Sequence, residues 1–255
     1  MRVTFLGTGT SVGVPAIGCE CEVCTSRDPL NRRLRTSAHV ALGDARLLLD
    51  ASIDLRQQAL RERIDRLDAV LLTHGHADHV FGLDDLRMFN YRQQGPVPVH
   101  ASPATLADVR RTFWYAFDDA AGASSRPQLD LRPVEGPFTV AGVRVVPFEV
   151  IHGTMSILGY RIGAFAYITD ASALPEASMR ILEGVEVLVI NALRRKAHPT
   201  HFTLEGALEA IARVGPRQAW LTHISHDLEH TSLGRELPPG VSPAHDGLVL
   251  EVGDP

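Results

Sequence analysis

A run of apolar residues leads directly into a dense cluster of metal-binding side chains in the segment Leu67-Asp68-Ala69-Val70-Leu71-Leu72-Thr73-His74-Gly75-His76-Ala77-Asp78-His79. The apolar run predicts a buried strand. His74 and His76 are two residues apart and point the same way from an extended segment, whereas Asp78 and His79 can turn toward a second centre. Imidazole suits Zn, Fe and related ions, and a carboxylate adds a harder oxygen ligand. The alternative, a solvated polar loop, does not need so many ligand groups, so the segment predicts a metal site.

Three further apolar runs end in side chains that bind metals. The run 150–151 is followed by His152, the run 166–169 by Asp170, and the run 219–222 by His223. Taken singly, each of these residues is more simply explained as a capped or hydrogen-bonded core residue. Four strand ends that all carry ligand groups favour a site, because function in such folds lies on loops held by the sheet.

Short apolar runs rich in Val, Ile and Leu recur along the chain and predict strands at 3–6, 40–42, 47–49, 69–72, 97–99, 143–150, 158–162, 166–168, 185–190, 219–221 and 248–252. Many of the runs are continuous, as expected for strands that are covered on both faces. Helices are predicted between them at 54–63, 105–117 and 204–214, the last with Thr203 as its N-cap and Gly215-Pro216 as its stop signal. The polar segment 118–132 is predicted to be a surface loop or lid. The pattern indicates an α/β fold of two sheets between outer helices, with residues 1–255 as a single domain.

Composition excludes several classes of protein. Of the 255 residues, 22% are charged and 45% hydrophobic, and the formal net charge is −5, which argues against a protein that holds long nucleic acid. No window approaches the roughly 20 apolar residues of a membrane-spanning helix. The apolar run in the opening MRVTFLGTGTSVG is too short, and too rich in Gly and Thr, for a signal peptide. We therefore expect a cytoplasmic protein without a membrane partner.

All 3 cysteines lie in the segment Cys19-Glu20-Cys21-Glu22-Val23-Cys24. An odd and tightly clustered set in a reducing compartment is a poor disulfide framework and a good site for a soft metal. The alternative is three buried thiols without metal.

The segment from His74 to His79 matches the H-x-H-x-D-H signature, and with the opening Phe5-Leu6-Gly7-Thr8-Gly9 the chain resembles the metallo-β-lactamase superfamily over nearly its whole length. The resemblance implies an αββα four-layer sandwich of two mixed sheets flanked by helices, and two catalytic divalent ions, Zn or Mn. It implies that one ion is held by His74, His76 and His152, the other by Asp78, His79 and His223, with Asp170 as the bridging carboxylate. Ala77 stands where an oxygen-reducing flavodiiron member carries Glu. A zinc β-lactamase would be exported and would lack the bridging aspartate.

A closer resemblance lies in Gly13-Val14-Pro15 and in the cysteine segment, which look like the PhnP-type phosphodiesterases of phosphonate breakdown. That family has a structural zinc held by three cysteines and a histidine placed three residues after the last catalytic ligand. The resemblance therefore implies a structural zinc on Cys19, Cys21, Cys24 and His226. A Cys₃His set is a closed site by ligand type. The resemblance also implies a homodimer.

The segment His198-Pro199-Thr200-His201 precedes the third predicted helix. In the PhnP branch, and in the related RNase Z that matures tRNA, a histidine at the position of His201 faces the scissile phosphate. Without the resemblance, a surface or capping histidine is the simpler interpretation. His198 is interpreted as a support for the loop, and Arg194-Arg195 either meets a substrate phosphate or is simply solvated. His39, His100, His230 and His245 have no informative spacing and are interpreted as structural.

The resemblance implies hydrolysis of a small phosphodiester, such as 5-phosphoribosyl 1,2-cyclic phosphate, with His201, Asp78 and Asp170 as catalytic residues. A tRNA 3′-processing endonuclease is the first alternative, but such enzymes carry a basic, Gly-rich arm that is not visible in this sequence. A thioester or lactone hydrolase of the same fold is the second alternative, and a non-catalytic metal-binding module is the third. The presence of all seven expected catalytic-pair ligands weighs against the third.

Overall fold

Two seven-stranded sheets face each other in the computed structural model, which describes residues 1–118 and 125–253. The first sheet has the order β14-β1-β2-β3-β4-β5-β6, with β1 (Arg2–Gly7), β2 (Ser37–Leu42), β3 (Ala45–Leu49), β4 (Ala69–Leu71), β5 (Val97–Ala101), β6 (Leu129–Pro133) and β14 (Val249–Glu251). The second has the order β13-β12-β11-β10-β9-β8-β7, with β7 (Phe138–Val140), β8 (Val143–His152), β9 (Met155–Ile162), β10 (Phe165–Tyr167), β11 (Val187–Asn191), β12 (Gln218–Thr222) and β13 (Val241–Pro243).

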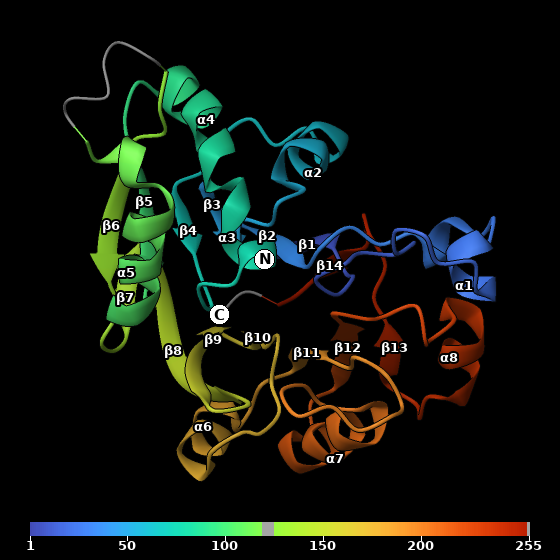
Figure 1. Ribbon diagram of the computed structural model, residues 1–255. Coiled ribbons are helices and arrows are strands. Elements are labelled where there is room, and N and C mark those ends of the chain that lie inside the picture. Colours follow the sequence, from blue (N-terminus) through green and yellow to red (C-terminus); the bar gives the residue numbers. More distant parts are fainter. Residues whose placement is uncertain (119–124, 254–255) are drawn as a thin grey trace.

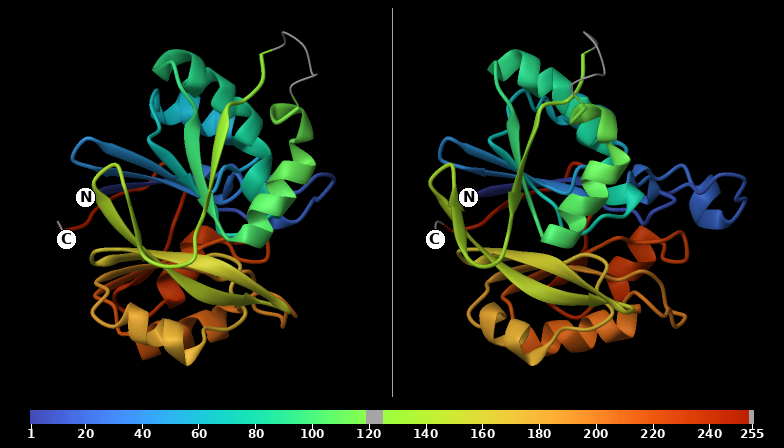
Figure 2. Two further views of the ribbon diagram at one scale, coloured as in Figure 1. Left: turned by 90° about the vertical axis from the view of Figure 1, so that its left-hand side faces the viewer. Right: turned by 60° about the vertical axis from the view of Figure 1, so that its left-hand side comes forward.

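Helices cover the outer faces of both sheets (Figure 1). On the first sheet lie α2 (Leu55–Glu62), α3 (Ala77–Val80), α4 (Leu86–Gln93) and α5 (Pro103–Thr112), together with the 3-10 turns η2 (Phe81–Asp85) and η3 (Trp114–Ala116). On the second lie α6 (Glu176–Leu182) and α7 (Leu204–Val214), while α1 (Glu22–Thr25), η1 (Pro29–Asn31) and α8 (His230–Glu236) gather at one end. Figure 2 shows the resulting order of layers, helix, sheet, sheet, helix. This confirms the predicted α/β fold of two mixed sheets flanked by helices.

The inner strands have continuously apolar sequences because alternate residues face two different apolar layers. Leu47 and Leu49 of β3 face the core between the two sheets, whereas Leu48 faces the helices outside the first sheet. Val187 of β11 faces the same inner core, and its neighbour Leu188 packs under the helices of the second sheet. Because both faces of these strands are buried, neither face needs polar residues.

Both sheets are parallel on one side and antiparallel on the other. β3, β4, β5 and β6 run parallel in the first sheet, and β10, β11, β12 and β13 run parallel in the second. The carboxyl ends of parallel strands lie at the same edge of a sheet, which is where ligands bind in open α/β sheets. The loops after β3, β4, β10 and β12 therefore meet at one end of the sandwich.

The helix α7 has the predicted bounds and caps. Thr203 accepts a hydrogen bond from the backbone N–H of Gly206, and Gly215 ends the helix with a φ of 66°. The helix predicted at 54–63 is α2. The helix predicted at 105–117 begins earlier, at Pro103 with Ser102 as its cap, and breaks at Phe113 before η3.

The loop predicted at 118–132 is wrong in its last part. Residues 129–132 belong to β6, which pairs with β5 at the edge of the first sheet. Leu129 and Leu131 alternate along it and pack on the core under α4 and α5, and Asn90 holds the backbone of Gln128 at its start. Residues 119–124 of that segment lie outside the described residues. Within the described part of the chain, no helix is both long and apolar enough to cross a membrane.

Candidate metal centre

The first candidate ligands lie where β4 ends and α3 begins. Thr73 to Gly75 connect the strand to the helix, and His76 is the N-cap of α3, with φ −68° and ψ 151°. Asp78 and His79 follow in the first turn of the helix. Gly75 between the two histidines has a steric role, because a Cβ there would lie 2.6 Å from Oδ2 of Asp108. His74 and His76 thus precede the helix, whereas Asp78 and His79 lie within it, and the two pairs point in different directions.

The side chains form two groups that share Asp170. In each group the ligand atoms lie within 4.8 Å of one another. The first group, which we call group A, is His74, His76, His152 and Asp170, and the second, group B, is Asp78, His79, Asp170 and His223. The structure thus brings together all seven residues that the sequence predicts for the catalytic pair, in the two sets that the resemblance implies.

The two oxygens of Asp170 face different groups. Oδ1 lies 3.4 Å from Nε2 of His79 and 3.2 Å from Nε2 of His223. Oδ2 lies 3.8 Å from Nε2 of His74 and 4.0 Å from Nε2 of His152. Asp170 has a φ of 59°, a left-handed conformation that costs energy for a residue with a side chain. This backbone turn aims one carboxylate at both groups.

Unpaired polar atoms show what these groups lack. Among the residues that the structure describes, Nε2 of His79 and both ring nitrogens of His223 are buried without a hydrogen-bond partner. Buried polar atoms are normally paired, so orphaned ring nitrogens beside carboxylate oxygens indicate a missing partner. Imidazole and carboxylate are the donor set of Zn and related divalent ions. The residues present therefore fit divalent metal ions.

The protonation states of the side chains at the centre also bear on metal binding. Burial lowers the pKa of His74 well below its usual range, and the neighbouring His79 lowers it further, so the His74 ring is neutral. Burial alone would raise the pKa of Asp170, but the His223 and His79 rings outweigh it and hold the pKa well below its usual range. Burial would lower the pKa of His79, but the carboxylates of Asp170 and Asp78 outweigh it and raise that pKa well above its usual range. Because neutral imidazole and ionised carboxylate are the forms that bind metals, His79 must give up a proton when an ion binds.

Asp50, which the sequence reasoning missed, supports the centre from behind. It is fully buried at the end of β3 and accepts hydrogen bonds from the backbone N–H and the hydroxyl of Thr73, at 2.8 and 3.0 Å. Its Oδ2 also lies 2.8 Å from Nδ1 of His79, and the Thr73 hydroxyl lies 3.0 Å from Nδ1 of His74. One carboxylate thereby orients a histidine in each group. The signal available was an apolar run, Leu47-Leu48-Leu49, that ends in an aspartate.

His201 lies beside the centre without belonging to either group. Its Nε2 is 3.1 Å from Oδ2 of Asp170, on the loop that precedes α7. The preceding residue, Thr200, accepts a hydrogen bond from Nδ1 of His152 through its carbonyl, at 2.7 Å. The loop is thus tied to a residue of group A.

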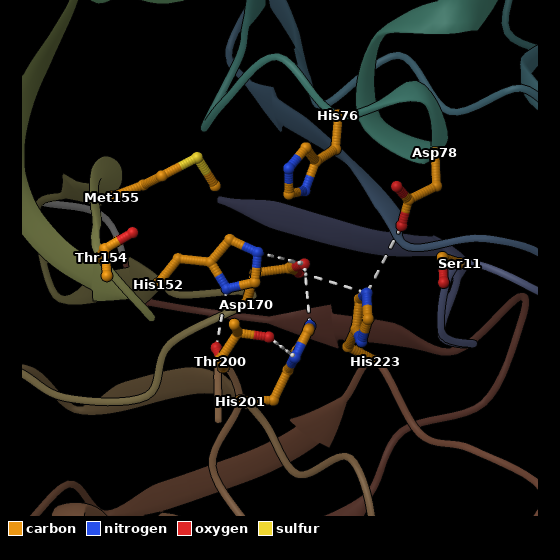
Figure 3. Close-up of a pocket in the computed structure, with 10 residues that line it drawn as sticks. All are labelled: Ser11, His76, Asp78, His152, Thr154, Met155, Asp170, Thr200, His201 and His223. Atoms are coloured by element: carbon orange, nitrogen blue, oxygen red, sulfur yellow. Dashed lines mark hydrogen bonds and ion pairs between the residues drawn. The ribbon is translucent and has the colours of Figure 1, made fainter. Parts of the chain in front are cut away.

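A pocket of about 400 Å³ opens over the two groups (Figure 3). Its lining residues are Ser11, His76, Asp78, His152, Thr154, Met155, Asp170, Thr200, His201 and His223. Arg194 and Arg195 are not among them. Arg195 pairs with Glu236 at 2.6 Å, and Arg194 bonds to backbone carbonyls of its own loop. His39, His100, His230 and His245 also lie outside both groups.

The cysteines form a separate group with His226. The Sγ atoms of Cys19 and Cys21 each lie 3.3 Å from Nδ1 of His226, and Cys24 is the fourth member. The backbone N–H of Cys24 donates to Sγ of Cys21 and, with the His226 ring, lowers the pKa of the Cys21 thiol to about 6. This set fits a closed soft-metal site. Cys24 lies in α1 and Cys21 is its N-cap, and Figure 1 shows α1 beside α8 at one end of the molecule.

A family model described as the beta-lactamase superfamily domain matches residues 45–224, more than two-thirds of the chain. The chain belongs to this superfamily. A solved structure described as a new diphosphatase from the PhnP family is 43% identical, with a TM-score of 0.93 over 99% of this chain and 98% of that one. This places the chain in the PhnP family and confirms that it is a hydrolase of the metallo-β-lactamase fold.

Two other similar proteins are not named as PhnP-family members. A protein of Porphyromonas gingivalis named octanoyltransferase is 42% identical over 97% of this chain, but the chain spans only 51% of that relative's length. The zinc-bound PqqB of Methylobacterium extorquens superposes with a TM-score of 0.80 at 24% identity, over 99% of this chain and 100% of that one. At that identity the likeness concerns the fold alone.

Proposed function

We propose that this hydrolase cleaves a small phosphodiester with two divalent ions, Zn or Mn, bound at groups A and B. The proposed ligands of one ion are His74, His76 and His152, those of the other are Asp78, His79 and His223, and Asp170 bridges both. A structural zinc on Cys19, Cys21, Cys24 and His226 completes the proposal.

The observation that carries this proposal is the place of His201. Its ring lines the pocket and reaches Asp170, yet it is outside both proposed ligand sets. A histidine in this position suits a proton donor to the leaving group. An alkoxide leaving from phosphorus is strongly basic and gains much from protonation, whereas a thiolate, with a pKa of about 8.5, gains little. His201 therefore favours a phosphodiester over a thioester.

Each residue has a part in the proposed hydrolysis. Ions bound at groups A and B supply the Lewis acid that activates water and offsets the charge of the phosphodiester. The water loses one proton to solvent, its oxygen forms a bond to phosphorus, and the bond from phosphorus to the ester oxygen breaks. Nε2 of His201 gives its proton to that leaving oxygen. Asp78 and Asp170 remain ionised, and Asp170 holds the two groups at a fixed separation.

The size of the pocket and the PhnP relative support a small substrate. A volume of about 400 Å³ suits a sugar or nucleoside phosphate. A cyclic ribose phosphate, such as 5-phosphoribosyl 1,2-cyclic phosphate, fits this description and would connect the protein with phosphonate breakdown. The related structure is described as a diphosphatase, so a diphosphate bond is the second substrate to test. A cytoplasmic location and a homodimer belong to the same proposal.

The test is a substrate panel on protein reconstituted with Zn or with Mn. The panel holds a cyclic ribose phosphate, bis-p-nitrophenyl phosphate, a dinucleoside diphosphate, a tRNA precursor and an octanoyl thioester. We expect turnover of the first two, abolished by chelator and restored by metal. Turnover of the thioester alone would contradict the proposal and would support an acyl function in keeping with the octanoyltransferase relative. Sedimentation of the same sample tests the homodimer.

A further inference from the structure

A second histidine lies directly behind His201. Nδ1 of His198 is 3.1 Å from Nδ1 of His201, and the two ring centroids are 4.9 Å apart at an interplanar angle of 68°. His198 is partly buried and is not among the residues that line the pocket. It therefore contacts two residues that line the pocket, His201 and Thr200, without lining it itself.

The direction of the hydrogen bonds follows from a donor whose hydrogen is fixed by the backbone. The backbone N–H of Thr200 points at Nδ1 of His198, 3.4 Å away, so this nitrogen acts as an acceptor and carries no hydrogen. The hydrogen between the two rings must then sit on Nδ1 of His201. The hydroxyl of Thr200 lies 2.8 Å from Nδ1 of His201, so it is a second acceptor for the hydrogen on that nitrogen.

We infer that His198 is a positioning residue for the hydrolysis: with Thr200 it holds Nδ1 of His201, so that Nε2 of His201 faces the pocket and Asp170. This inference rests on the proposed role of His201 as proton donor. Figure 3 shows the Thr200 side of this arrangement, with the hydroxyl at one edge of the His201 ring and Asp170 at the other. An imidazole held at one nitrogen cannot rotate to present the other.

The loop is anchored at other points besides its contacts with His198. Its carbonyl at Thr200 is held by His152, and Thr200 also packs against Gly153, where a Cβ would lie 2.7 Å from its Cγ2. Pro199 fixes the backbone between the two histidines. Replacement of His198 should therefore loosen the His201 ring, which Thr200 alone would then hold at Nδ1, while these anchors keep the loop in place.

Two variants separate the hydrogen bond from the bulk of the ring. His198→Asn places an acceptor oxygen close to the position of Nδ1, whereas His198→Leu places a methyl group there. We expect His198→Leu to lower kcat by about 3- to 10-fold, the worth of one hydrogen bond, for an alkyl phosphodiester with a poor leaving group. KM, metal content and melting temperature should stay the same. The kcat of His198→Asn should return close to that of the wild type.

The coupling to His201 is tested in a double-mutant cycle. In a His201→Ala background, His198→Leu should have no further effect, because the ring that it positions is gone. An independent loss in that background, or an equal loss for His198→Asn and His198→Leu, would overturn the inference. So would an unchanged kcat in His198→Leu.

A measurement without substrate distinguishes this inference from the proposed function. Long-range ¹H–¹⁵N spectra of the metal-loaded protein report the histidine ring protons. We expect a protected Nδ1–H signal for His201 that is kept in His198→Asn and that exchanges faster and shifts in His198→Leu, where Thr200 is the remaining acceptor. If the wild type hydrolyses no phosphodiester, the proposed function fails, and these spectra still decide whether His198 holds the ring. An identical His201 signal in all three proteins would overturn the inference on its own.

Discussion

Oδ2 of Asp50 lies 2.8 Å from Nδ1 of His79, deep beneath the proposed metal centre. Both side chains are fully buried, and Asp50 also accepts two hydrogen bonds from Thr73. With Nδ1 committed to this carboxylate, Nε2 of His79 is the atom left for group B. A carboxylate that fixes the tautomer and orientation of a histidine in this way tunes its affinity for metal.

For Asp50→Asn we therefore expect metal affinity to fall by about 10- to 100-fold, the usual range for loss of such a supporting group. Asparagine replaces one acceptor oxygen by a donor, and this donor would face Thr73 or His79. Titration of the apoprotein with zinc against a competing chelator measures the effect. Asp54→Asn is the matched control, since Asp54 lies near in the chain but pairs with Arg35. Equal zinc affinity in wild type and Asp50→Asn would refute this role.

The candidate site could be predicted from the sequence where ligand groups are dense or stand at strand ends. His74, His76, Asp78 and His79 are informative by spacing alone, and the ends of β8, β10 and β12 supplied the rest. Asp50 could not be found this way. Its contacts with Thr73 and His79 arise only when β3 and β4 pair in parallel, and nothing in a single aspartate after an apolar run distinguishes it from a turn residue.

The errors in the fold have a similar cause. The strand β6 was missed because Leu129 and Leu131 alternate with Asp130 and Arg132, and short alternation at a sheet edge resembles a polar loop. Its burial comes from Asn90 and the core under α5, which are distant in sequence. The early start of α5 was visible in Ser102-Pro103, a cap followed by proline in the first turn.

Asp170→Ala should lose most activity while the protein stays folded. Asp170 lies in both groups, so its removal should leave at most one ion well held. Metal content per chain and turnover, measured on the same sample, check this outcome. The melting curve of the apoprotein controls for folding. Wild-type occupancy together with wild-type turnover would show that Asp170 is not the bridging ligand.

His201→Ala should lower kcat by about 10²- to 10⁴-fold, the range for lost general acid–base help. Catalytic metal content should hardly change, because His201 lies outside both groups. The loss should be smaller for a p-nitrophenyl ester, whose leaving group needs little protonation. His245→Ala, remote from both groups, serves as the control. An equal loss for good and poor leaving groups would favour phosphate binding over proton donation, and loss of metal would show that His201 is a ligand.

The Cys₃His group joins segments from the two ends of the chain. His226 is separated by 207 residues from Cys19 and by 205 from Cys21. Closing so long a loop costs the unfolded chain entropy, and an ion bound by all four residues offsets that cost only in the folded state. Near this contact, Glu229 accepts a hydrogen bond from Asn31, so α8 and η1 are also joined by side chains.

Cys21→Ser should lower metal content by about one zinc per chain and reduce the melting temperature, because a hydroxyl is a much poorer ligand for zinc than a thiolate. Activity per folded molecule should survive, since a closed shell of four protein ligands leaves no position for water or substrate. Glu22→Gln is the matched control, an exposed neighbour on α1 that is outside the group.

Metal analysis, thermal melts and turnover are measured on both variants. Full zinc content and an unchanged melting temperature in Cys21→Ser would overturn the structural role. Loss of all metals at once would show instead that the two sites are coupled, for which the short link from His223 to His226 provides a direct physical route.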